Sequence, residues 1–161
     1  MDDRFYRGAR PKDSDFAALK AIGVNTVIDL ESEPKDTERG AAEAAGLHYV
    51  NIPVVDKQPP TDEQIAAFLK TVDDPQTGVF YVHCAGGRHR TGDMGAVYRL
   101  NKYGWSFDQA FQEMKNYDFY TSNGHGSQKD FVVDYFSQNE KHRAEVAANI
   151  TKSVAPAISG K

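Results

Sequence analysis

The sequence predicts a single α/β domain in which a central, mostly parallel sheet is flanked by helices. Three short apolar segments, 26–30, 47–52 and 78–82, have the length and composition of buried strands. Helix signals separate these segments, and only helices are expected after the last one. No linker or internal repeat divides the chain, so we expect one domain over residues 1–150 and a C-terminal tail over 151–161.

One short helix is expected on each side of the first strand. Residues 15–22 follow Asp13 and Ser14, either of which can cap a helix start, and Gly23 stands where a helix commonly ends. The Ala-rich stretch 38–45 is expected to form a second short helix that ends at the glycine after it.

Two segments carry the capping-box pattern, in which a hydroxyl and an amide side chain each satisfy a free end group of a helix. Thr61-Asp-Glu-Gln64 opens one helix, and Ser106-Phe-Asp-Gln109 opens another that runs toward residue 117. A helix over about 91–103 precedes the second box, and a terminal helix is expected over about 128–150. Between them, residues 118–127 are expected to form a loop because of their Gly and Asn content.

The charge balance excludes several kinds of partner. With 19 Lys and Arg against 23 Asp and Glu, the net charge is −4, so we expect no nucleic-acid partner. No apolar run approaches the roughly 18 residues of a bilayer span, so no membrane insertion is expected. We expect a soluble protein, cytoplasmic, or periplasmic or secreted if a signal peptide has been removed. The oligomeric state is left open.

The single cysteine lies in the most informative stretch, His83-Cys84-Ala85-Gly86-Gly87-Arg88-His89-Arg90-Thr91, between a strand and a helix. Two adjacent glycines let the backbone turn its N–H groups inward as a cradle for an anion at the helix start. Arg90 follows Cys84 by six residues and can grip two phosphoryl oxygens with its planar fork. The stretch therefore predicts a phosphate-binding loop.

The same surroundings favour the thiolate form of Cys84, since N–H groups, a helix start and cations all stabilise a negative charge. A thiolate that faces a phosphoryl group predicts attack at phosphorus to give a phosphocysteine, which needs no metal or other cofactor. Thr91 can donate a hydrogen bond to the sulfur as it leaves, or it can merely cap the helix. We expect a supporting role for His83, through hydrogen bonds that orient the loop.

The motif His-Cys-x5-Arg-Thr resembles the signature of the cysteine-dependent protein tyrosine phosphatase superfamily. The segments 5–11 and 27–30 are similar to the openings of compact atypical dual-specificity phosphatases, and Asp56-Lys-Gln-Pro-Pro-Thr-Asp-Glu-Gln-Ile65 resembles the acid loop of bacterial tyrosine-phosphatase-like phytases. Gly86-Gly87-Arg88-His89 departs from the phytase pattern and is closer to plant and fungal phosphatases that resemble inositol pyrophosphatases. The resemblance implies a tyrosine or dual-specificity phosphatase-like fold.

Hydrolysis of a phosphate ester also needs an acid that protonates the leaving oxygen. The resemblance implies that this acid is Asp56, which lies on a proline-rich loop able to carry a side chain into a pocket. Asp62 and Glu63 compete for the role, but both fall in the first turn of a capped helix, where acidic residues interact with the helix dipole.

The substrate prediction depends on the charges around the cradle. Arg88 and His89 lie in the loop and Lys57 adjoins the acid, so we expect these three to contact phosphates of a polyphosphorylated small molecule, with Ala85, Gly86 and Gly87 supplying backbone N–H groups. The expected function is a metal-independent phosphatase of inositol polyphosphates such as phytate.

Several alternatives remain open from the sequence. The nearest is a protein tyrosine or dual-specificity phosphatase, and an inositol pyrophosphate phosphatase is a further one. A non-catalytic phosphate-binding module would be expected to lack Cys84 or Arg90, and a rhodanese-type sulfurtransferase would not need Arg90 with a separate acid. Asp118, Tyr120, His125 and Lys129 belong to a loop region that could approach the site, but structural roles are expected for them.

Overall fold

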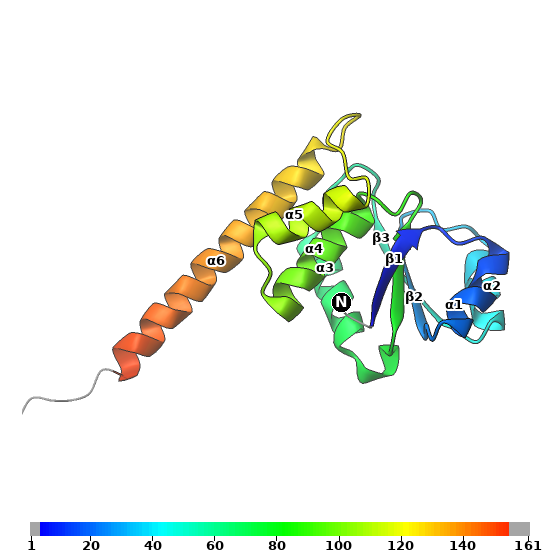
Figure 1. The fold of residues 1–161 in the computed structure, drawn as a ribbon, viewed down its shortest axis with the longest axis horizontal. Coiled ribbons are helices and arrows are strands. Elements are labelled where there is room, and N and C mark those ends of the chain that lie inside the picture. The colour runs from blue at the N-terminus through cyan, green and yellow to red at the C-terminus, as the bar shows by residue number, and fades with distance from the viewer. Residues whose placement is uncertain (1–3, 155–161) are drawn as a thin grey trace, which may run out of the picture.

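The computed structural model describes residues 4–154 and forms a parallel four-stranded sheet with helices on both faces (Figure 1). The strands are β1 (Phe5–Ala9), β2 (Thr26–Glu31), β3 (His48–Val54) and β4 (Phe80–Cys84), in the order β1-β4-β2-β3. The expected α/β class with a central parallel sheet is confirmed. Strand β4 is interior in the sheet, as its apolar sequence predicts.

Strand β1 was not among the expected strands. It pairs in parallel with β4 over its whole length, and its last residue, Ala9, stands opposite Cys84. The segment contains an arginine and a glycine and does not have a continuous apolar run, which is why its pattern gave no strand signal. Pairing with β4 is therefore a tertiary effect that places β1 beside the cysteine.

The expected helices are all present, with boundaries shifted by a few residues. They are α1 (Phe16–Ala21), α2 (Glu38–Ala44), α3 (Asp62–Asp73), α4 (Arg90–Tyr103), α5 (Phe107–Asn116) and α6 (Gly126–Val154), with short 3₁₀ turns at Asp13–Asp15 and Pro75–Thr77. Both capping boxes form, because Thr61 and Ser106 each accept a hydrogen bond from the backbone three residues later. Helix α6 includes residues 151–154 of the expected tail, and 155–161 lie outside the described residues.

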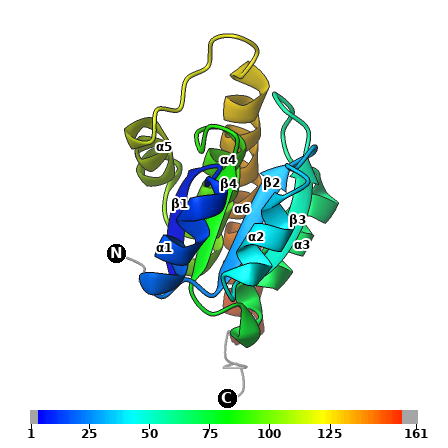
Figure 2. The same cartoon turned by 90° about the vertical axis from the view of Figure 1, so that its right-hand side faces the viewer.

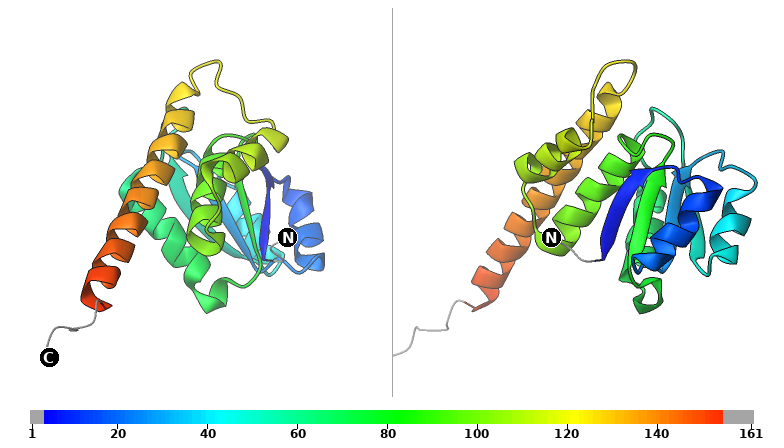
Figure 3. Two further views of the ribbon diagram at one scale, coloured as in Figure 1. Left: turned by 60° about the vertical axis from the view of Figure 1, so that its left-hand side comes forward. Right: turned by 45° about the vertical axis from the view of Figure 1, so that its right-hand side comes forward.

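The helices cover the sheet in layers. Figure 2 shows α1 and α2 on one face of the sheet, where Phe16, Val27 and Leu47 belong to one buried cluster. Helices α3 and α4 cover the other face, around Phe68, Phe80 and Met94. Helices α5 and α6 pack outside α4 through a further buried cluster, so α4 is enclosed between the sheet and two helices (Figure 3).

This layering determines where a site can form. Strand β4 leads into α4 at the carboxyl edge of the sheet, and the loops that follow β3 and α5 lie at the same end of the molecule (Figure 2). Ligands of open α/β sheets bind at this edge because the loops there converge. In residues 4–154, no helix combines the length and the apolar character needed to cross a bilayer.

Candidate active site

Cys84 and Arg90 bracket a tight loop between β4 and α4. Cys84 is the last residue of the strand and Arg90 the first of the helix, and both are buried. Between them Gly87 has φ +68°, a conformation that favours glycine. A Cβ at Gly87 would lie 2.2 Å from the backbone carbon of Gly8 in β1, so the loop rests directly on the neighbouring strand.

A buried cation lies beneath the loop. Arg7 of β1 donates a hydrogen bond from Nη2 to the Gly87 carbonyl at 3.3 Å, and its Nη1 lies 3.6 Å from Glu113. Its guanidinium also stacks on the Tyr117 ring at 4.2 Å. Burial lowers the pKa of Arg7 below its ordinary value, against the influence of Glu113, Tyr117 and the nearby Cys84. The sequence analysis missed this residue, because β1 had to be placed before Arg7 could be related to the loop.

A cavity of about 310 Å³ opens in front of the loop. It brings together eight residues that the sequence singled out for the site and three from the loop between α5 and α6. The eight are Asp56, Lys57, Cys84, Ala85, Gly86, Arg88, His89 and Arg90, and the three are Tyr120, Asn123 and His125. Gly87, Thr91 and His83 are buried and do not line the cavity.

Asp56 reaches the cavity from the loop after β3. Its Oδ1 lies 3.7 Å from Nη2 of Arg90, and its side chain is 60% exposed. Arg90 is held from the same segment, since its Nη1 donates to the Val54 carbonyl at 3.2 Å. Asp62 and Glu63 do not line the cavity but lie in the first turn of α3, where hydrogen bonds at the helix start lower the pKa of Glu63. The geometry therefore favours Asp56 over both competitors.

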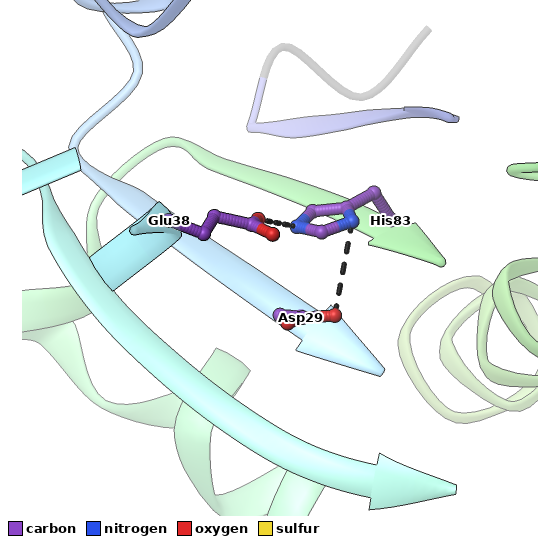
Figure 4. A group of neighbouring side chains, drawn as sticks. All are labelled: Asp29, Glu38 and His83. Carbon is purple, nitrogen blue, oxygen red and sulfur yellow. Dashed lines mark ion pairs between the residues drawn. The ribbon is translucent and has the colours of Figure 1, made fainter. Parts of the chain in front are cut away.

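His83 is fully buried behind the loop and faces two carboxylates (Figure 4). Its Nε2 lies 2.7 Å from Oε1 of Glu38, and its Nδ1 lies 3.8 Å from Oδ1 of Asp29. Burial raises the pKa of Asp29, while a hydrogen bond from the Tyr49 hydroxyl at 2.6 Å opposes that rise. These contacts join β4 to β2 and α2 directly beneath the cysteine.

The same cluster is the candidate metal site of residues 4–154, because the donor atoms of Asp29, Glu38 and His83 lie within 4.8 Å of one another. Both Asp29 oxygens already accept hydrogen bonds, one from Tyr49 and one from the Glu31 backbone. His83 Nε2 and Glu38 Oε1 lie 2.7 Å apart as an ion-pair contact, closer than two ligands of one metal ion lie to each other. The arrangement suits an imidazole held between carboxylates better than a metal ion.

His89 takes part in the cavity wall through ring contacts. Its Nε2 donates to the Tyr120 carbonyl at 3.0 Å, and its ring stacks on His125 with 3.5 Å between centroids and 6° between planes. Burial, and then the proximity of His125, lowers the pKa of His89 from 6.5 to about 4. His89 is therefore neutral near pH 7 and does not supply the positive charge that the sequence analysis expected of it.

Lys57 and Arg88 are the exposed cations at the cavity. Lys57 has φ +61°, which is uncommon for a lysine, and its carbonyl accepts a hydrogen bond from the Ser127 hydroxyl at 3.1 Å. Asn123, across the cavity wall, also has a positive φ of 58°. Backbone conformations of this kind persist where the surrounding structure fixes them, as happens at ligand sites.

A cysteine at the end of an interior parallel strand, with an arginine at the start of the next helix, defines the class of cysteine-based phosphatase domains. A model of the family described as a dual-specificity phosphatase (DSP-PTPase) fused to NAD+ kinase matches residues 1–134, and the chain belongs to this family. The resemblance to compact atypical dual-specificity phosphatases is thereby confirmed.

Individual relatives agree with this assignment. The chain is 29% identical over 119 residues to the dual specificity protein phosphatase TpbA of Pseudomonas aeruginosa, a match that covers 74% of this chain and 53% of TpbA. It therefore spans about half the length of that relative. The inositol diphosphatase DSP4 of Arabidopsis thaliana is 25% identical over 157 residues, covering 88% of this chain and 73% of DSP4.

Solved structures show the same fold. The crystal structure of P. aeruginosa TpbA matches with a TM-score of 0.69 and 25% identity, over 83% of this chain and 81% of that one. The catalytic core of the PP-IP phosphatase SIW14 from S. cerevisiae matches with a TM-score of 0.69 at 19% identity, over 91% and 88% of the two chains. At that identity the second match supports the fold alone.

The contact between the loop and β1 leads to a stability prediction. Gly87→Ala should lower the free energy of unfolding by about 1–3 kcal/mol or more, because a Cβ there meets the backbone of Gly8 and cannot be accommodated by a side-chain movement. Gly86→Ala is the matched control, since the nearest atom to its Cβ would be 4.0 Å away, and it should stay within about 1 kcal/mol. Chemical denaturation measures both, and equal losses would contradict the close approach.

The depressed pKa of His89 leads to a prediction about pH. Between pH 6.5 and about 4 the unfolded chain binds a proton at this histidine that the folded chain does not, so stability is complete above pH 6.5 and declines toward pH 4. His89→Phe keeps a ring for the stack but cannot titrate. Denaturation at pH 7 and pH 5 should therefore show a smaller loss for this variant than for the parent, whereas His142→Phe, an exposed control on α6, should keep the parent's loss.

Proposed function

We propose that the protein is a metal-independent phosphomonoesterase that works through a phosphocysteine and acts on inositol polyphosphates such as phytate. The observation that carries the proposal is the convergence of Cys84, Arg90 and Asp56 on one cavity, with Lys57 and Arg88 at its wall. A nucleophile, an oxyanion clamp and an acid are the three groups that this chemistry needs.

In the first step the Cys84 thiolate attacks phosphorus, a sulfur–phosphorus bond forms, and the bond to the leaving oxygen breaks. Arg90 pairs with the equatorial oxygens, and Asp56 gives its proton to the leaving oxygen. Water then attacks the phosphocysteine, its proton passes to the Asp56 carboxylate, and the thiolate leaves. The Thr91 hydroxyl is fully buried and has no hydrogen-bond partner in the described part of the chain, so it is available to stabilise that thiolate.

Two observations favour a substrate with several phosphates. The chain has a net charge of −4, yet among the described residues its cavity is lined by Lys57, Arg88 and Arg90 against the one carboxylate of Asp56. The relative DSP4 is an inositol diphosphatase. An inositol pyrophosphate is therefore a further candidate substrate.

A protein tyrosine or dual-specificity phosphatase is the second candidate. It is favoured by the relative TpbA, a dual specificity protein phosphatase, and by the aromatic ring of Tyr120 at the cavity. The deciding experiment compares kcat/KM of the purified protein for phytate and for a phosphotyrosine peptide. Higher kcat/KM for the peptide would replace the first candidate by the second.

The assigned roles predict distinct losses. Cys84→Ser should retain binding of phosphorylated ligands and lose turnover, because a serine hydroxyl stays protonated at neutral pH.

Asp56→Asn should retain binding, slow turnover by about 10²–10⁴ and abolish the fall in rate at high pH. Arg90→Lys should impair both binding and turnover, since a point charge cannot replace two oriented hydrogen bonds. A pH–rate profile unchanged in Asp56→Asn would assign the acid elsewhere.

The polyphosphate hypothesis predicts a difference between substrates. Neutralisation by Lys57→Gln or Arg88→Gln should raise KM for phytate far more than KM for a small aryl phosphate, because the aryl ester has one phosphate and cannot use peripheral cations. Added salt should act in the same direction, since it screens exposed charges more than the buried Arg90. Lys102→Gln, on the far part of α4, is a matched charge control. Equal responses of both substrates would leave Lys57 and Arg88 as surface charges only.

A further inference from the structure

A buried chain of polar groups ends at the cavity wall. Gln128, in the first turn of α6, is fully buried and donates from Nε2 to Oδ2 of Asp93 at 2.9 Å. Its Oε1 accepts a hydrogen bond from Nδ1 of His125 at 2.7 Å. Asp93 lies in the first turn of α4, three residues after Arg90. The chain therefore connects the helix that carries the phosphate clamp to the loop between α5 and α6.

These contacts fix the His125 ring from two directions. Gln128 holds the ring edge, and the His89 ring covers one face at 3.5 Å. Because Nδ1 is used by Gln128, Nε2 is the ring nitrogen that can meet a ligand. His125 is only 5% exposed, yet it lines the cavity together with Cys84 and Arg90.

Such a chain is costly as a purely structural link. Asp93 is completely buried, one of its carboxylate oxygens has no hydrogen-bond partner, and burial raises its pKa well above 3.8. Apolar side chains could join α4 to α6 without desolvating these groups. This chain of polar groups also sets the orientation of a histidine at the candidate active site, which apolar packing would not do.

The surroundings of His125 suit an anion. The Lys57 side chain passes over the same loop, since a Cβ at Gly124 would lie 3.3 Å from its Cδ. The Lys57 backbone is held by Ser127, the residue next to Gln128. Lys57 and His125 thus belong to one wall of the cavity, while Asp56 is the single carboxylate that lines it in the described structure.

We propose that His125 is a further substrate-binding residue, whose Nε2 shares a proton in a hydrogen bond with a phosphate group of the substrate other than the phosphoryl group held by Arg90. Asp93 and Gln128 are positioning residues that act through His125. Lys57 completes this second anion subsite. The inference rests on the proposed function and deepens it, because it assigns the residues that distinguish a polyphosphate from a simple phosphate ester.

The test measures binding in the full chain with Cys84→Ser, which removes turnover. Calorimetric titrations with phytate and with inorganic phosphate give the affinity ratio, which is the affinity for phytate divided by the affinity for inorganic phosphate. His125→Phe keeps a ring against His89 but removes Nε2, so this ratio should fall about 10-fold, the loss expected for one charge-assisted hydrogen bond. His142→Phe, at an exposed position of α6, is the matched control and should leave the ratio unchanged.

A second variant at position 125 distinguishes loss of the ligand contact from misfolding. His125→Asn can still donate to Gln128 but ends short of the cavity, so it should lower the ratio as His125→Phe does, and thermal unfolding of both variants checks that the domain is intact. Gln128→Met tests the positioning role, because it should lower the ratio alone and add no further loss when combined with His125→Phe. An additive loss would overturn the coupling between the two residues.

The outcomes separate this inference from the proposed function. If the Cys84→Ser protein binds inorganic phosphate but not phytate, the polyphosphate function itself fails. If it binds phytate and the affinity ratio is the same with His125, Phe or Asn at position 125 in folded protein, the function stands and the role of His125 is wrong.

Discussion

The close contact between the cysteine loop and β1 is the constraint on which the rest of the site depends. Gly87 lies so near the backbone of Gly8 that no side chain fits between them, and Arg7 binds the Gly87 carbonyl from below. The loop is therefore held by a neighbouring strand as well as by its own covalent ends. A loop fixed in this way can keep Cys84 and Arg90 in one geometry without reorganisation when a ligand binds.

Electrostatics at the site are local and differ from those of the whole chain. Cations gather at the cavity of an acidic protein, and the histidine within the loop is neutral because it is buried and stacked on His125. Behind the loop acidic side chains take the place of the cations, since His83 faces Glu38 and Asp29. Separate layers of charge, one facing the ligand and one facing the core, thus surround a single short loop.

The loops after β3 and after α5 are held against the sheet and its helices by specific contacts. Asp56 pairs with Arg90, and the late loop is fixed by the buried chain through Gln128 and Asp93. Substrate-binding groups on loops gain precision when buried polar partners orient them. The domain thereby combines a cradle built on the sheet with a cavity wall built on loops.

The sequence by itself determined the fold class, the helices with their capping boxes, and the loop from Cys84 to Arg90, because these depend on periodicity and on residues that are close in the chain. Tertiary structure alone decided that β1 pairs with β4, which brings Arg7 under the loop, and that His125 lies against His89. Those contacts join residues far apart in the sequence and leave no local pattern, since a buried arginine and a stacked histidine look like any other polar residues until packing gives them neighbours.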